Sequence, residues 1–126
     1  MKRFGLIAIV ATVIILAGGV FLFSRSNKPQ TVHVQPLTGY EYFWGNGCTY
    51  CENVEKFFES WEGKTKIQIE KREVWYNSGN AKAMAARAES CNIPKSELAV
   101  PFLVTPDGKC IMGDEPIIQH FKELKF

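Results

Sequence analysis

The chain has 126 residues, a length that predicts one folded domain. Hydrophobic residues make up 46% and charged residues 22% of the sequence, and this composition argues against intrinsic disorder. The net charge is +2, but four of the fifteen basic side chains and none of the thirteen acidic ones lie in residues 1–28. The rest of the chain is therefore slightly acidic, which argues against a nucleic-acid-binding function.

The N-terminal segment is long and apolar. Residues 4–23 contain no charged side chain, and a helix of this length, at ~1.5 Å per residue, would span the ~30 Å hydrocarbon core of a bilayer. A cleaved signal peptide usually has a shorter apolar core and a small-residue exit, whereas residues 20–23 are all large. We therefore expect residues 1–24 to be a retained signal anchor that contacts the membrane through residues 4–23.

Basic residues on both sides of this segment predict its orientation. Two basic residues and the α-amino group precede it, two basic residues follow it, and the positive-inside rule favours a cytoplasmic N-terminus. We therefore expect a single-pass cell membrane protein whose C-terminal domain is extracytoplasmic, in the periplasm or on the outer face. Residues 25–38 are polar, contain two prolines and lack a helical period, so we interpret them as a linker to a domain at 39–126.

The domain alternates between strand and helix patterns. Tyr40–Trp44 is predicted to be an aromatic strand. Apolar residues recur at helical spacing over 51–62, which predicts a helix, and Gly63 is expected to end it. The β-α-β-α-β-β-α order predicts an α/β fold with a mixed sheet, because a helix joins the first two strands as a parallel crossover and a hairpin joins the last two. The later elements are expected to be a strand at 66–75, a turn at 77–80, a helix at 81–91, a strand at 100–105, a hairpin turn at 106–108, a strand at 109–112 and a last helix from 113–114.

A CxxC motif, Cys48-Thr49-Tyr50-Cys51, lies where the first strand ends and the first helix begins. Free N–H groups and the helix dipole at a helix N-terminus stabilise an anion, so they favour a thiolate at Cys48, and the thiolate is the reactive nucleophile. Cys51 lies one turn further along the helix, close enough to form a reversible disulfide. Cys48 and Cys51 are therefore the predicted catalytic residues.

The four cysteines also allow two other interpretations. A structural zinc site would use all of them, but such sites usually contain two CxxC pairs, whereas Cys91 and Cys110 are nineteen residues apart. A passive disulfide within the CxxC would stabilise the fold little, because the loop that it closes is very short. We expect no metal, and the alternatives to an enzyme are a non-catalytic tethered binding module or the zinc site.

Two later sequence features accompany the strand–CxxC–helix arrangement. They are Val100-Pro101 at the start of a strand and Gly113-Asp114 before the last helix. Together they resemble the thioredoxin-like superfamily, in particular small membrane-tethered thioredoxin/glutaredoxin-type domains. The resemblance implies a thioredoxin-like fold and a thiol–disulfide oxidoreductase that uses no cofactor. Its substrates would be protein cysteines or disulfides, and it allows a membrane redox partner.

The resemblance also implies roles for residues around the motif. The bond between Val100 and Pro101 is expected to be cis. A cis X-Pro bond is uncommon in folded proteins and usually has a structural or functional role. The backbone of Val100 would then pair with a substrate strand and hold the substrate cysteine over Cys48. We expect Trp44 at the rim of the site, and the remaining substrate-binding candidates are the two residues inside the motif, Thr49 and Tyr50.

Three features depart from the family pattern. Tyr42 occupies the position of the buried acid of thioredoxins, so Glu41 or a water would have to accept the proton of Cys51. The motif shares only Tyr50 with the glutaredoxin sequence CPYC. No basic residue immediately precedes the motif, which argues against glutathione dependence.

Cys91 and Cys110 are candidates for a structural disulfide. Outside the cytoplasm two remaining thiols tend to oxidise. A bond between them closes a loop of about 20 residues, which would stabilise a small domain by roughly 3 kcal/mol. The alternative is that both are buried free cysteines that pack as small hydrophobic side chains.

Overall fold

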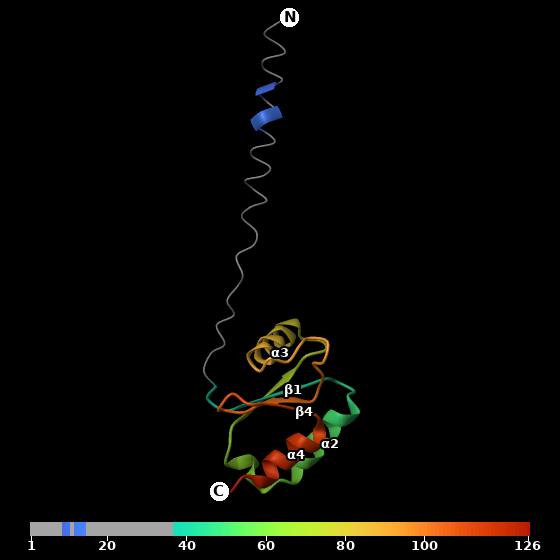
Figure 1. Cartoon of the computed structure of the whole chain (residues 1–126). Coiled ribbons are helices and arrows are strands. Elements are labelled where there is room, and N and C mark those ends of the chain that lie inside the picture. Colours follow the sequence, from blue (N-terminus) through green and yellow to red (C-terminus); the bar gives the residue numbers. More distant parts are fainter. Residues whose placement is uncertain (1–8, 11, 15–36) are drawn as a thin grey trace, which may run out of the picture. The chain divides into compact units, whose positions relative to one another are not determined.

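The computed structural model describes residues 9, 10, 12–14 and 37–126 of the chain (Figure 1). The five residues of the first group are helical, and the Thr12 hydroxyl donates a hydrogen bond to the Ile9 carbonyl at 2.9 Å. Among the residues described, no helix is both long and apolar enough to cross a membrane. Most of the predicted anchor at 1–24 and of the linker at 25–38 lies outside the described residues, so both stay predictions.

Residues 37–126 form four strands, three α-helices and one short 3-10 helix. They follow the predicted β-α-β-α-β-β-α order, which is therefore confirmed. The elements are β1 (Tyr40–Trp44), α2 (Thr49–Ser60), η1 (Glu62–Thr65), β2 (Ile69–Glu73), α3 (Ser78–Ser90), β3 (Phe102–Val104), β4 (Cys110–Met112) and α4 (Asp114–Glu123).

The strands form one mixed sheet in the order β2-β1-β3-β4. β1 pairs in parallel with β2 and antiparallel with β3, and β3 forms an antiparallel hairpin with β4. Helix α3 covers one face of the sheet, while α2 and α4 cover the other (Figure 1). β1 is thus an inner strand, and the loop that leaves its C-terminal end is supported by strands on both sides.

Side chains alternate along β1 and divide the core into two clusters. Tyr42 points to the α2 and α4 face, and Phe43 points to the α3 face; both are fully buried. These large aromatic side chains hold β1 from both sides. The first cluster also contains Tyr40, Val54, Phe58, Leu103, Ile117 and Phe121, and the second contains Met84, Ala88, Phe102 and Val104.

Strand β2 is shorter than the sequence pattern predicted. It begins at Ile69 rather than at residue 66, because residues 66–68 form the turn that leaves the 3-10 helix η1, and it ends at Glu73 rather than at residue 75. The Trp61 ring lies so close to Gly63 that a Cβ at that glycine would be 2.2 Å from it. The glycine therefore permits the chain to fold back against the ring before β2 starts.

Helix α3 begins where we expected a turn. Residues 78–80 are its first turn rather than a separate loop. The side chain of Asn77 accepts a hydrogen bond from the backbone N–H of Asn80 at 3.0 Å. This is the usual way in which asparagine caps a helix, and it satisfies one N–H that has no partner within the helix.

The predicted disulfide between Cys91 and Cys110 is present. It joins the C-cap of α3 to the first residue of β4, with Cα atoms 6.2 Å apart. The loop that it closes contains the Val100–Pro101 bond and strand β3. The bond therefore ties α3 to the hairpin side of the sheet.

We expect replacement of both Cys91 and Cys110 by alanine to lower the free energy of unfolding by about 3 kcal/mol, because the unfolded chain loses its loop constraint. Urea denaturation of the variant and the oxidised wild type measures the difference. A change smaller than about 1 kcal/mol would contradict a structural role for this bond.

Candidate functional site

The CxxC begins at the junction between β1 and α2. A turn follows Trp44, in which Cys48 N donates to the Gly45 carbonyl at 3.1 Å and Gly47 has a φ of +85°. Cys48 is the N-cap of α2, and its Sγ accepts a hydrogen bond from the backbone N–H of Cys51 at 3.2 Å. The sulfur thus occupies the place of a capping oxygen, where free N–H groups and the helix dipole stabilise a thiolate.

Cys48 and Cys51 form a disulfide, with their Cα atoms 5.2 Å apart. Cys48 is 7% exposed and Cys51 is 2% exposed, so both lie largely below the surface. Cys51 is in the first turn of α2 and points toward the core with Val54 and Phe58. Cys48 is therefore the sulfur nearer to the surface, and Cys51 lies beneath it.

The Val100–Pro101 bond is cis, which confirms that prediction. The Val100 carbonyl oxygen lies 3.9 Å from Cys48 Sγ, although the two residues are 52 positions apart in the chain. Pro101 is buried, and its own carbonyl accepts a hydrogen bond from Gly113 N at 2.9 Å. The start of β3 and the end of β4 are thereby held beside the CxxC.

The predicted rim residues differ in their exposure. Tyr50 is 64% exposed and Thr49 is also exposed, both in the first turn of α2. Trp44 is half-buried and packs against the first core cluster. The structure thus places Thr49 and Tyr50 at the surface, and the use of all three in substrate binding stays a prediction.

Trp75 was not predicted as a site residue, yet it lies against the loop between β1 and the CxxC. Its ring is so close to Gly45 that a Cβ there would meet it at 2.4 Å, and the side chain is 55% exposed. The parallel pairing of β1 and β2, in which Trp44 pairs with Glu73, could have identified Trp75 as a neighbour of this loop. Residues that follow Glu73 must therefore lie at the same edge of the sheet as residues that follow Trp44.

The Glu73 carboxylate ties the two loops at this edge together. It accepts backbone hydrogen bonds from Trp75 and Tyr76, both at 2.9 Å, and from Asn46 at 3.3 Å. Partial desolvation raises the pKa of Glu73, but the N–H donors of Tyr76, Trp75, Asn46 and Asn77 outweigh it, so the pKa lies below its usual value. The ionised carboxylate thus holds the backbone of Trp75 beside the loop that precedes the CxxC.

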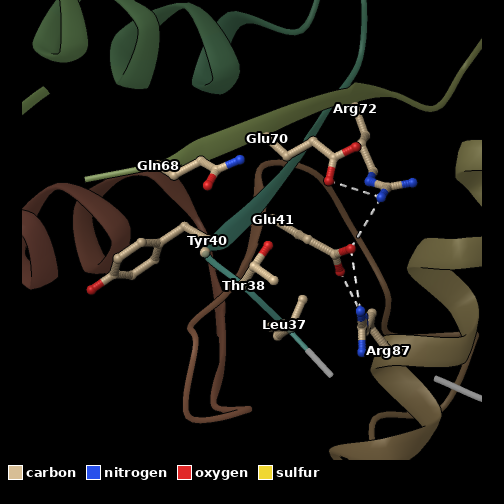
Figure 2. Close-up of a pocket in the computed structure, with 9 residues that line it drawn as sticks. Leu37, Thr38, Tyr40, Glu41, Gln68, Glu70, Arg72 and Arg87 are labelled. Atoms are coloured by element: carbon tan, nitrogen blue, oxygen red, sulfur yellow. Dashed lines mark hydrogen bonds and ion pairs between the residues drawn. The ribbon is translucent and has the colours of Figure 1, made fainter. Parts of the chain in front are cut away.

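Glu41, named above as a possible acceptor of the Cys51 proton, does not lie near the CxxC. It is on the α3 side of β1, where it pairs with Arg87 at 2.6 Å and with Arg72 at 3.2 Å. Figure 2 shows these groups around a cavity of about 160 Å³ at the beginning of β1. Cys51 lies on the opposite face and near the opposite end of the strand, so the structure does not place Glu41 at the CxxC.

The four cysteines separate into two pairs, Cys48 with Cys51 and Cys91 with Cys110. In the part of the chain that the structure describes, no three His, Cys, Asp or Glu side chains are grouped as metal ligands would be. The arrangement that the structure does provide is a dithiol–disulfide pair at the start of a helix. Chemically, such a pair can take up and release two electrons.

Comparison with known proteins provides no relative: no family model, curated protein or solved structure matches the chain. The mixed α/β sheet and the Cys48–Cys51 disulfide are compatible with a thioredoxin-like fold.

We expect Glu73→Gln to weaken the loop contacts in a pH-dependent way. The folded-state pKa of Glu73 is lowered, so its stabilisation is present above the unfolded value near 4.5 and is lost as the pH falls through the folded value. The difference in unfolding free energy between wild type and variant should therefore be largest near neutral pH and shrink in acid. Urea titrations across this pH range measure it, and a difference that does not change with pH would contradict the assignment.

We expect Glu41→Gln to lower the free energy of unfolding by about 3 kcal/mol, because Arg87 then loses its buried counter-ion. Glu70→Gln is the matched control, since the exposed Glu70 also pairs with Arg72 but lies at the surface, and its loss should change stability little. Denaturant unfolding compares the two variants. Equal effects would contradict the buried ion network, and slower thiol exchange in Glu41→Gln would contradict its separation from the CxxC.

Proposed function

We propose that this chain is a thiol–disulfide oxidoreductase that exchanges disulfides with protein substrates through Cys48 and Cys51. One observation carries the proposal: Cys48 Sγ caps α2 and lies 3.2 Å from a backbone N–H while bonded to Cys51. The same N–H can stabilise the thiolate when the disulfide is reduced. Stabilisation of a thiolate matters only for a disulfide that is reduced, so this placement favours a redox role over a purely structural one.

The proposed reaction is two consecutive exchanges. In the reductive direction the Cys48 thiolate attacks a substrate disulfide, forms a mixed disulfide and releases the first substrate sulfur as a thiolate. Cys51 then loses its proton and attacks Cys48 Sγ, so that the Cys48–Cys51 bond forms and the second substrate sulfur leaves. The substrate disulfide gains two electrons, the dithiol loses them, and oxidation of a substrate dithiol follows the reverse order. No cofactor takes part.

The surroundings of Cys48 support a polypeptide substrate. The Val100 carbonyl, 3.9 Å from Cys48 Sγ, can accept a hydrogen bond from a substrate backbone N–H. Tyr50 and Trp75 present exposed aromatic surface on two other sides of the loop. These features fit an extended peptide that brings its own sulfur to Cys48.

The finer assignments belong to the same proposal. We take the protein to be of the membrane-tethered thioredoxin/glutaredoxin type, anchored by residues 4–23. Its catalytic domain would then lie outside the cytoplasm, where the Cys91–Cys110 bond is stable. In that compartment a redox partner in the membrane would exchange electrons with the Cys48–Cys51 pair.

Cysteine variants of the full chain test the proposal with a peptide that contains one disulfide. We expect Cys51→Ser to accumulate a one-to-one mixed disulfide at Cys48, because the resolving thiol is missing. Cys48→Ser, the matched control, should form no comparable adduct, since its remaining thiol is buried. Mass spectrometry with and without reductant measures the adducts.

Two results would contradict the proposal. If neither variant forms an adduct, the Cys48–Cys51 bond is passive and the chain is better described as a binding module. If Cys48→Ser and Cys51→Ser form adducts equally fast, α2 does not activate Cys48 as its N-cap position implies.

A further inference from the structure

The sulfur of Met112, the last residue of β4, contacts the chain segment that carries Val100. The backbone N–H of Ala99 donates a hydrogen bond to Met112 Sδ at 3.3 Å, across thirteen positions of the chain. Ala99 immediately precedes Val100, whose carbonyl oxygen lies 3.9 Å from Cys48 Sγ. The thioether therefore helps to hold the backbone at which a substrate peptide is proposed to bind.

Residues 92–100 form an irregular and mostly exposed segment between α3 and β3. The disulfide at the C-cap of α3 fixes its start, and the buried Pro101 fixes its end. Between these points Leu98 and Val100 pack against the second core cluster through their side chains. The hydrogen bond to Met112 adds a direct tie between the backbone of this segment and β4, one residue before Val100.

The thioether of Met112 is also open to oxidants. Met112 is 36% exposed, whereas Met84 in the second core cluster is 5% exposed. A two-electron oxidant such as hydrogen peroxide transfers one oxygen atom to a thioether, which becomes a sulfoxide, and leaves as water. Of the two methionines that the structure describes, Met112 is therefore the one that peroxide can reach.

A sulfoxide cannot hold Ala99 in the same way. An oxygen atom added between the sulfur and the Ala99 N–H has no room at a separation of 3.3 Å, so the backbone must move away. An oxygen atom added elsewhere on the sulfur draws electron density from it and leaves a weaker acceptor. In both cases the carbonyl of Val100 loses a support beside Cys48.

We propose that Met112 is a site of reversible oxidation that controls how a peptide substrate binds beside Cys48. The inference rests on the proposed oxidoreductase function and adds a modification site to it. In the forward step peroxide gives one oxygen atom to Met112 Sδ, which loses two electrons, and the peroxide is reduced to water. In the return step a methionine sulfoxide reductase removes the oxygen atom as water, and a dithiol supplies the two electrons and becomes a disulfide.

A methionine that only packs in the hairpin predicts a different result. Met112 pairs with Phe102 across β3 and β4, so a purely structural disturbance there would slow exchange with every substrate alike. Loss of the support at Ala99 slows only substrates that use the Val100 carbonyl. A peptide disulfide has backbone N–H groups for that carbonyl, whereas a small aryl disulfide has none, so the two substrates distinguish the two roles.

The test treats the full chain in detergent with hydrogen peroxide while Cys48 and Cys51 are bonded, because the disulfide protects both sulfurs. Mass spectrometry should find one added oxygen atom on the Met112 peptide and none on the Met84 peptide. After reduction of the Cys48–Cys51 bond and removal of the reductant, exchange with the peptide disulfide should be slower by about fivefold, the effect of one ordinary hydrogen bond. Exchange with the aryl disulfide should be unchanged, and methionine sulfoxide reductases should restore the peptide rate.

Met112→Leu and Met84→Leu are matched variants, because leucine keeps a similar apolar volume and has no sulfur. We expect Met112→Leu to exchange slowly with the peptide before treatment and not to change with peroxide. Met84→Leu should match the wild type before and after treatment. If Met112→Leu does not fold, the oxidised and the repaired wild type still decide the question.

Three results would overturn the inference: peptide exchange that is unchanged when Met112 is a sulfoxide, equal slowing with both disulfides, or oxidation of Met84 before Met112. These results leave the proposed function intact when the untreated wild type reacts with both disulfides. Absence of exchange in the untreated wild type contradicts the oxidoreductase proposal itself, and the inference then falls with it.

Discussion

The hydrogen bond between the Cys51 N–H and Cys48 Sγ is the contact on which the arrangement of the site depends. It makes a sulfur atom of the CxxC the cap of α2, so the start of the helix fixes the position of Cys48 Sγ. The contact requires β1 to end at a fixed place, and β1 is held there by Tyr42 on one face of the sheet and Phe43 on the other. Core packing therefore determines where the sulfur lies.

The same sheet edge gathers two other segments around this sulfur. The parallel pairing of β1 with β2 brings Glu73 and Trp75 to the loop, and the antiparallel pairing with β3 brings Val100 and Pro101. Each segment is attached by its own contact rather than by the CxxC. The supports of the loop therefore do not depend on the Cys48–Cys51 bond.

Local patterns predicted the elements well, because they depend on near neighbours in the chain. The glycine turn before Cys48, the apolar face of α2 and the proline at the start of β3 are all visible in the sequence. Trp75 was not identified as a neighbour of the CxxC loop, since its position depends on the register between β1 and β2. Alternation does place Glu41 and Tyr42 on opposite faces, but only the packing of α3 shows which face belongs to Glu41.

We propose that Cys48 and Cys51 form a redox-active pair while Cys91 and Cys110 form a structural bond. Equilibration of the full chain in graded thiol/disulfide buffers, followed by alkylation and mass analysis of the two peptide pairs, tests it directly. The account predicts reversible titration of Cys48–Cys51 between about −120 and −270 mV, the range of known oxidants and reductants. Cys91–Cys110 should stay bonded throughout, and a Cys48–Cys51 pair that never changes its state would contradict the account.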